Sequence, residues 1–127
     1  MTIDELQQFI GLKYQKLDAE GKAFGCMAPV YIFHPDLPHY EWPDESNFST
    51  GFLELLERHG EKVAKDEMLP GDVIAFKIPG NYLHVGVYLG DGKVIHCMRD
   101  DTMERCRLSL IERRIEGIFR WNPGGER

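Results

Sequence analysis

The stretch of residues 84–96, His-Val-Gly-Val-Tyr-Leu-Gly-Asp-Gly-Lys-Val-Ile-His, constrains the fold of this chain more than any other. Two runs rich in β-branched residues flank Gly90-Asp91-Gly92, and a short glycine-containing turn between two such runs is typical of a β-hairpin. We therefore predict an antiparallel hairpin whose loop is formed by these three residues.

The register of this hairpin decides which side chains meet, because successive side chains of a strand point to opposite faces. A three-residue loop places these residues opposite each other: Leu89 and Lys93, Tyr88 and Val94, and Gly86 and His96. One face is then mostly apolar, whereas the other carries His84 and His96. These two histidines become diagonal neighbours, with backbones roughly 7–8 Å apart, a gap that long side chains can bridge. Gly86 leaves room for the imidazoles to meet.

The length and composition are those of an ordinary globular domain. With 127 residues the chain can build one domain with a core, and no apolar run is long enough to span a membrane. No secretory leader is visible, so we expect the protein to be cytoplasmic as synthesised. The net charge of −6 argues against sequence-independent binding to nucleic acid or to an anionic membrane. Three cysteines are an odd and sparse set, which indicates a reducing compartment without disulfides.

The first half of the chain carries helical patterns. Thr2 and Glu5 form a capping-box signature ahead of apolar residues at helical spacing, and Gly11 ends that pattern. A second amphipathic pattern at 49–59 stops at Gly60. We predict a helix for each pattern.

The apolar run at 26–33 lies between two connections without clear periodicity, 12–25 and 34–47. Pro29 fits the first turn of a helix and not its middle, so a helix in this run must begin near Cys26. A buried strand is the alternative for so short an apolar run. The proline-containing connection 34–47 is long for a small domain, which is typical of a functional segment such as a cleft wall.

The second half of the chain carries strand patterns. Besides the hairpin, alternation predicts strands at 72–78, 105–111 and 115–121, and the first of these lies between turns at Pro70-Gly71 and 79–81. Helices that come first and strands that follow predict the α+β class, with N-terminal helices packed on a C-terminal antiparallel sheet.

Cys26, His84 and His96 form a candidate catalytic group. A cysteine at a helix start lies where unpaired N–H groups and the helix dipole favour the thiolate. A nearby histidine can take the thiol proton, and a third polar group can hold that histidine in the required tautomer. In this interpretation Cys26 attacks a carbonyl, with its own N–H stabilising the oxyanion, His84 is the base, and His96 accepts a hydrogen bond from the other ring nitrogen of His84.

Each of these residues also has an ordinary structural interpretation. A cysteine in an apolar run is usually a core residue, by roughly four to one, and a histidine on a strand is usually structural. We assign the remaining cysteines and histidines in that way: Cys97, Cys106, His34, His39 and His59. From spacing alone, a catalytic Cys–His site and an ordinary structural role for these residues are about equally probable.

Three stretches, taken in sequence order, match one known pattern. They are Gly-Leu-Lys-Tyr at 11–14 with Cys26 following twelve residues after its tyrosine, Leu-Pro-Gly-Asp-Val-Ile-Ala-Phe at 69–76, and the hairpin at 84–96. Together they resemble the NlpC-type family of cysteine peptidases, which are cell-wall endopeptidases with a papain-like fold. The resemblance implies that 1–127 forms a single peptidase-like domain.

Carried over to this sequence, the resemblance implies roles for four residues. Cys26 becomes the nucleophile, His84 the base and His96 the orienting group. Tyr14 becomes a hydroxyl near the thiol that assists the oxyanion or the substrate, whereas without the resemblance it would be a loop residue packed over the core. The implied enzyme is a cysteine peptidase that needs neither a cofactor nor a metal.

The residues around the candidate nucleophile depart from the family pattern. Members commonly have Asp before the cysteine and Ser or Trp followed by Gly after it, whereas this chain has Gly25-Cys26-Met27-Ala28. The paired glycines that follow the family's tyrosine are also missing. These positions shape the substrate side of the cleft, so the departures bear on the substrate more than on the catalytic trio.

The resemblance implies hydrolysis of an amide bond in peptidoglycan stem peptides, of the D-glutamyl–diamino-acid type. Weaker similarities at 37–40 and 113–120, and the missing leader, favour a phage or prophage tail component associated with the virion. The expected partners are a peptidoglycan peptide or another peptide substrate and phage-tail proteins, with no nucleic acid and no membrane.

Two alternatives belong to other functional classes. The first is a non-catalytic or tail-protein-processing assembly module that retains the peptidase fold. The second is a metal site built from His84, His96 and a cysteine, which we rank last because no pair of candidate ligands has a short metal-binding spacing.

Overall fold

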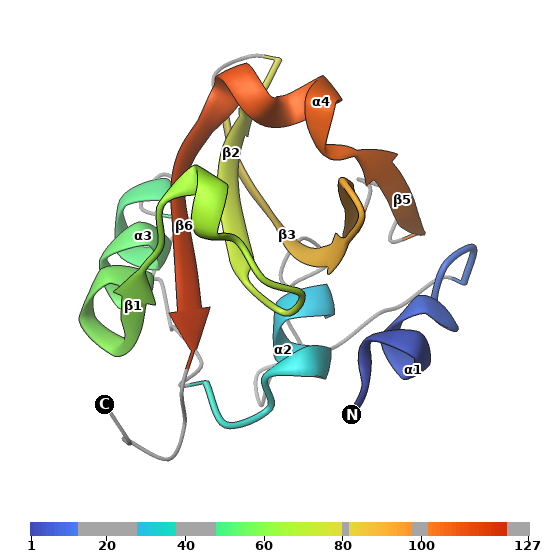
Figure 1. Cartoon of the computed structure of the whole chain (residues 1–127). Coiled ribbons are helices and arrows are strands. Elements are labelled where there is room, and N and C mark those ends of the chain that lie inside the picture. The colour runs from blue at the N-terminus through green and yellow to red at the C-terminus, as the bar shows by residue number, and fades with distance from the viewer. Residues whose placement is uncertain (13–27, 38–47, 80–81, 98–101, 122–127) are drawn as a thin grey trace.

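The structure of the chain is a computed structural model. It describes residues 1–12, 28–37, 48–79, 82–97 and 102–121. The helical elements, in chain order, are α1 (Ile3–Gln7), α2 (Ala28–Phe33), α3 (Phe48–His59), the 3-10 helix η3 (Lys65–Glu67), α4 (Leu108–Ile111) and the 3-10 helix η4 (Glu112–Arg114). The strands are β1 (Gly60–Lys62), β2 (Val73–Ile78), β3 (Tyr82–Gly90), β4 (Lys93–Cys97), β5 (Met103–Arg107) and β6 (Ile115–Trp121). Helices first and strands afterwards confirm the predicted α+β class (Figure 1).

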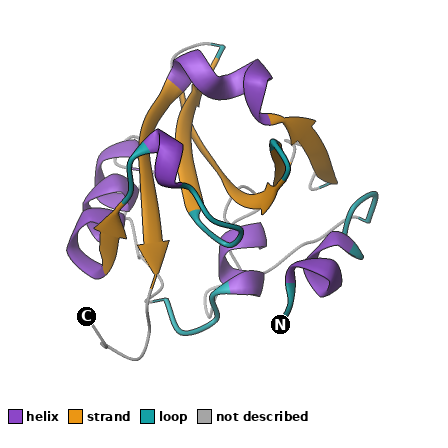
Figure 2. Cartoon of the chain, in the orientation of Figure 1, coloured by secondary structure: helices purple, strands orange, loops and turns teal. Residues whose placement is uncertain are grey.

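The strands of the described residues form one antiparallel sheet in the order β1-β6-β2-β3-β4-β5. Helix α2 packs on β3 and β4, and helix α3 packs on β1, β3 and β6. Figure 2, in the orientation of Figure 1, shows β2 and β6 near the centre of the view and the edge strands β1 and β5 at its two sides. The expected arrangement of N-terminal helices on an antiparallel sheet is therefore confirmed. None of the described helices is long and apolar enough to cross a membrane.

Both faces of the sheet carry an apolar core. The first core joins the helices to the sheet, and Val30 of α2 and Leu56 of α3 meet Val85 of β3 in it. The second core lies on the other face and has these buried members: Ile74, Phe76, Val94, Ile111 and Ile118. This division confirms the two faces predicted for the hairpin, because Val85 and Val94 belong to different cores.

The hairpin of β3 and β4 has most of the predicted register. Gly86 pairs with His96, as predicted. The predicted partner of Lys93 is wrong, because Gly90 takes that place and the register shifts between Tyr88 and Gly90. The loop is a two-residue turn in which Asp91 and Gly92 both have positive φ, at 52° and 70°, as a type I′ turn requires. The register shift lengthens β3 without changing which residues share a face with the histidines.

The N-terminal residues form the predicted capped helix and then reach the sheet. The side chain of Thr2 accepts a hydrogen bond from the N–H of Glu5, and the Glu5 carboxylate accepts one from the N–H of Thr2. After the helix, the N–H of Gly11 donates to the carbonyl of Met103, and the N–H of Met103 donates to the carbonyl of Leu12. The N-terminal segment is therefore hydrogen-bonded to the outer edge of β5.

The run at 26–33 is helical over its described part, so the alternative of a buried strand is wrong. Helix α2 begins at Ala28, and Pro29 occupies its first turn, where the missing N–H has no intrahelical partner to lose. Ala28 and Val30 are buried against the sheet. Of the connections predicted at 12–25 and 34–47, residues 13–25 and 38–47 lie outside the described residues.

Two elements differ from the prediction. Residues 108–111 form α4 and not the end of a strand, because Leu108 and Ile111, three residues apart, pack the same helical face onto the second core. Gly60 does more than end α3, since it begins the edge strand β1. The predicted strands at 72–78 and 115–121 are confirmed as β2 and β6.

Candidate active site

The side chains of His84 on β3 and His96 on β4 meet on the face of the sheet that carries the second core. His84 Nε2 lies 3.2 Å from His96 Nδ1, within hydrogen-bond distance. Their ring centroids are 5.3 Å apart and the rings are almost perpendicular, at 89°. The diagonal contact predicted from the hairpin register is therefore present.

The imidazoles lie in an apolar setting formed by Phe76 of β2. Each imidazole makes a T-shaped contact with this ring, with centroids 5.3 Å apart for His84 and 6.4 Å apart for His96. His84 is the more buried of the two and retains 8% of its surface exposed. Phe76 stands directly opposite His84 in the β2–β3 register, so the sheet itself fixes this contact.

Burial determines the charge of both imidazoles. Desolvation, with a smaller contribution from His96, lowers the pKa of His84 to about 4. Desolvation also lowers the pKa of His96, although the carboxylate of Glu104, its cross-strand partner on β5, acts in the opposite direction. His84 is therefore neutral near pH 7, and a neutral imidazole is the form that can accept a proton.

The hydrogen bond between the rings also allows a definite tautomer. If His84 Nε2 donates to His96 Nδ1, the remaining ring nitrogen of His84, Nδ1, carries a lone pair. That nitrogen is then available as a general base. The arrangement matches the predicted roles, in which His96 accepts from one nitrogen of His84 and the other nitrogen serves the chemistry.

The other predicted site residues, Cys26 and Tyr14, lie outside the described residues. The structure brings together His84 and His96 and places the start of α2 two residues after Cys26. Within the described residues, no three His, Cys, Asp or Glu side chains gather into a group that could hold a metal ion. The alternative of a metal site would thus depend on Cys26.

The remaining cysteines and histidines have the structural roles assigned to them where they are described. Cys97 is buried in the first core, and Cys106 packs against the second, where burial raises the pKa of its thiol. The His59 ring makes an edge contact with Trp121 at 6.1 Å. His34 is hydrogen-bonded to the backbone, and His39 lies outside the described residues.

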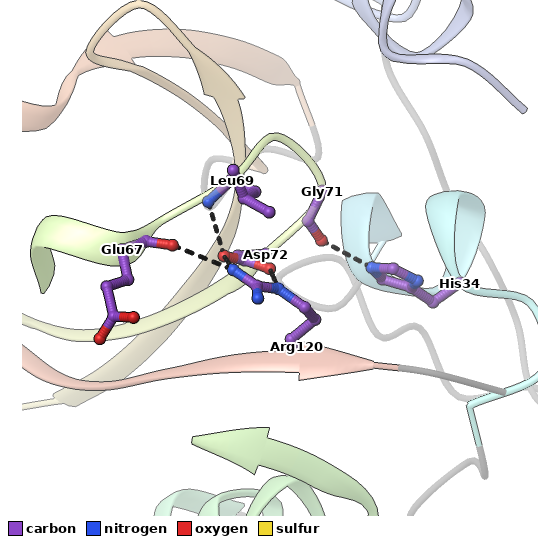
Figure 3. Close-up of polar contacts among 6 residues, drawn as sticks. All are labelled: His34, Glu67, Leu69, Gly71, Asp72 and Arg120. Carbon is purple, nitrogen blue, oxygen red and sulfur yellow. Dashed lines mark hydrogen bonds and ion pairs between the residues drawn. The ribbon is translucent and has the colours of Figure 1, made fainter. Parts of the chain in front are cut away.

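An ion pair between the start of β2 and β6, with a buried carboxylate, was not predicted from the sequence. Asp72, with 2% of its surface exposed, binds Arg120 through two hydrogen bonds of 2.9 Å, from Nε to Oδ1 and from Nη2 to Oδ2 (Figure 3). Arg120 Nη2 also donates to the carbonyl of Glu67 at 3.0 Å. The available signals were an acidic residue at the start of a buried strand and a basic residue within another, which is too little to pair them.

Comparison with known proteins agrees with this fold. A model of the NlpC/P60 family matches residues 12–114. The probable endopeptidase NlpC of Escherichia coli (strain K12) is 28% identical over 110 residues, which are 85% of this chain and 67% of that protein.

Two solved structures share the fold. The NlpC/P60 domain of peptidoglycan hydrolase SagA has a TM-score of 0.58 at 21% identity, and the match covers 92% of this chain and 93% of that one. A lipoprotein-like NLP/P60 family protein from Staphylococcus aureus subsp. aureus Mu50 has a TM-score of 0.61 at 19% identity; the match covers 94% of this chain but 39% of that one, less than half its length. With a family model that spans most of its residues, and with the fold of these structures, the chain belongs to the NlpC/P60 family.

Proposed function

We propose that this protein is a cysteine peptidase or amidase in which Cys26, His84 and His96 hydrolyse an amide bond. The observation that carries the proposal is the 3.2 Å contact between His84 Nε2 and His96 Nδ1, made by a buried and neutral His84 in a chain of this family. A base held by a second polar group is the arrangement that activates a nucleophilic thiol.

In the proposed reaction, Nδ1 of His84 takes the thiol proton and the sulfur of Cys26 attacks the substrate carbonyl. The tetrahedral intermediate collapses when the C–N bond breaks and the leaving amine receives the proton from His84. A thioester remains on Cys26. Water then loses a proton to His84, attacks the thioester carbonyl, and releases the carboxylic acid and the thiol.

The proposed role of His96 is to orient the base. A hydrogen bond from Nε2 of His84 to Nδ1 of His96 holds the ring of His84 and stabilises the imidazolium that forms during the reaction. Tyr14 is proposed to place its hydroxyl near the thiol, where it assists the oxyanion or the substrate. This last role rests on the family resemblance alone.

The substrate we propose is an amide bond in a peptidoglycan stem peptide. The names of two similar proteins support it, since one is a probable endopeptidase and the other is a domain of a peptidoglycan hydrolase. Of the unusual residues around Cys26, Gly25 and Met27 lie outside the described residues. Which stem-peptide bond is cleaved therefore has to be measured, by digesting purified peptidoglycan and identifying the new amine and acid ends by mass spectrometry.

The first test is the rate of alkylation of Cys26 as a function of pH, in the wild type and in His84→Ala. Mass spectrometry of the cysteine-containing peptides separates Cys26 from Cys97 and Cys106, which then serve as internal references. We expect a reactive thiolate at a pH well below the free-thiol pKa of about 8.5, lost in His84→Ala and kept in the control His59→Ala.

The same alkylation experiment distinguishes the proposed peptidase from the non-catalytic alternative. An ordinary thiol pKa that does not respond to His84 would leave a peptidase fold used for binding or assembly. The association with phage tails, the processing of a tail protein and the cytoplasmic synthesis stay predictions, because no described residue bears on them.

A further inference from the structure

A histidine that the proposed reaction does not use joins two parts of the site. His34 follows α2 directly, and its Nε2 lies 2.7 Å from the carbonyl oxygen of Gly71 (Figure 3). Because a carbonyl oxygen only accepts hydrogen bonds, Nε2 of His34 carries the proton and donates it. Burial lowers the pKa of His34, against the effects of this hydrogen bond and of the charge on Asp72, so the ring is neutral near pH 7.

The residue at the other end of this hydrogen bond must be glycine for two independent reasons. Gly71 has a φ of +99°, in the region that L side chains rarely adopt. A Cβ on Gly71 would also lie 2.9 Å from Cε2 of Phe33, the last residue of α2. The end of α2 is thus in contact with the backbone of Gly71 through both Phe33 and His34.

The loop of residues 69–72 is in turn fixed to the strand of His84. The N–H of Gly71 donates to the carbonyl of Tyr88 at 2.8 Å, and the N–H of Tyr88 donates to the carbonyl of Asp72 at 2.8 Å. Tyr88 lies four residues from His84 on β3. A short path of hydrogen bonds therefore runs from α2 through Gly71 to the strand that carries the proposed base.

Hydrogen bonds on the side away from α2 also hold the loop of residues 69–72. The loop therefore cannot easily shift together with α2. Asp72 accepts hydrogen bonds from the N–H of Leu69 at 2.8 Å and from Arg120 of β6. Figure 3 shows the loop between the Arg120 guanidinium and the His34 ring. His34 is the side chain through which α2 is hydrogen-bonded to this rigid loop.

We propose that His34 is a positioning residue that sets the separation between the helix following Cys26 and the strand carrying His84. The inference rests on the proposed function, because it assumes that Cys26 and His84 react together. The inference assigns a role in catalysis to a residue at the C-terminal end of α2, away from the reacting atoms. A displacement of about 1 Å between reacting groups can cost about 100-fold in rate, so one hydrogen bond at this place can affect catalysis.

The experiment compares His34→Leu, which removes the donor, with His34→Gln, whose amide N–H reaches about as far as Nε2. Leu55→Ala is the matched control, because Leu55 lies on α3 and belongs to the first core, and not to the second core that lies beside the histidines. Each variant is measured for thermal unfolding, for kcat and KM on the peptide substrate, and for the pH dependence of Cys26 alkylation. His84→Ala is measured in parallel.

We expect His34→Leu to lower kcat about tenfold with little change in KM and to move Cys26 alkylation toward that of an ordinary thiol. His34→Gln restores both, and Leu55→Ala leaves both unchanged. If His34→Leu does not fold, His34→Asn takes its place, because its N–H is too short to reach Gly71.

The inference is overturned if His34→Leu keeps the wild-type alkylation profile or if His34→Gln does not restore that profile. It is also overturned if Leu55→Ala shifts the profile as much as His34→Leu does. A failure of the proposed function looks different. In that case His84→Ala itself leaves the reactivity of Cys26 unchanged, whatever the His34 variants do.

Discussion

Arg120 and Asp72 form an ion pair with two hydrogen bonds, in which the Asp72 side chain is almost fully buried while the Arg120 side chain keeps about a third of its surface in solvent. The bonds to Asp72 raise the pKa of Arg120. The pair joins the start of β2 to β6 and supports the loop 69–72, which contacts both α2 and β3. Its main effect is on stability, because neither residue meets the histidines of the site.

Asp72→Asn should destabilise the fold by about 2–3 kcal/mol. The substitution removes the charge that compensates Arg120 and leaves a buried amide with an N–H group in place of an acceptor. Urea unfolding measures the loss. The exposed pair of Lys65 and Glu112, 3.8 Å apart, offers the control, since Glu112→Gln should change stability by less than about 0.5 kcal/mol. Equal losses in the two variants would contradict the importance of the buried pair.

Gly86→Ala should destabilise the hairpin by about 1–3 kcal/mol and disturb the histidine pair. A Cβ at Gly86 would lie 2.7 Å from Cγ1 of Val94 and 2.8 Å from the carbonyl oxygen of Ile95. Chemical unfolding gives the energetic effect, and the imidazole signals in NMR report the contact. Gly92→Ala is a useful comparison, because a Cβ there meets nothing within 4 Å although its φ is positive. An Ala variant at 86 with wild-type stability and spectra would refute the close packing.

Stability should fall as the pH is lowered from about 6.5 to about 4. The pKa of His84 is lowered to about 4 in the folded protein, while in the unfolded chain it returns to 6.5. Between these values the unfolded chain binds the extra proton, so its free energy drops relative to that of the folded state. The contribution, on the order of 2–3 kcal/mol, is fully present above pH 6.5 and is lost as the pH approaches 4.

Other groups also titrate in this pH range, so the test compares the pH dependence of the wild type with that of a variant that lacks His84. The free energy of unfolding is measured against pH for the wild type and for His84→Gln, and the two curves are subtracted. The difference should change with pH between about 6.5 and 4 and stay flat above pH 7.5. A difference that is constant over the whole range would mean that His84 is not held in its neutral form.

Replacement of His96 should lower kcat less when the new side chain can still accept the hydrogen bond from Nε2 of His84. His96→Asn retains an oxygen on the side chain that can accept from Nε2 of His84, whereas His96→Leu removes the acceptor. We expect His96→Leu to lose at least about tenfold in kcat, against about 10²–10⁴-fold for His84→Ala, with His96→Asn between His96→Leu and the wild type. Steady-state kinetics on the peptide substrate rank the variants, and equal activity of Leu and Asn would contradict an orienting role.

The sequence was most informative where a local pattern also determined the contacts. The turn after Leu89 and the alternation along the hairpin predicted that Gly86 faces His96, and the structure has that pair. The placement of Pro29 limited where a helix could begin in 26–33, although it did not exclude a buried strand. These features depend on neighbours along the chain, and local rules describe them well.

The features that were missed depend on distant residues. Strand β1 has no alternating pattern of its own and is held by pairing with β6. Residues 108–111 looked like a strand, but contact with the second core makes them helical. The pairing of Asp72 with Arg120 spans 48 positions, and the contact of His34 with Gly71 spans 37, so neither leaves a signal in a short window.

The segment after α1 gives the sheet one more property. Gly11 and Leu12 occupy the outward-facing N–H and C=O of Met103, the first residue of the edge strand β5. Unpaired edge groups of this kind are where a strand from another molecule adds to a sheet. The opposite edge is β1, which is short and carries the exposed charges of Glu61 and Lys62. At Met103 the chain's own backbone takes the place that an added strand would occupy, and at the opposite edge the charges of Glu61 and Lys62 disfavour such a strand.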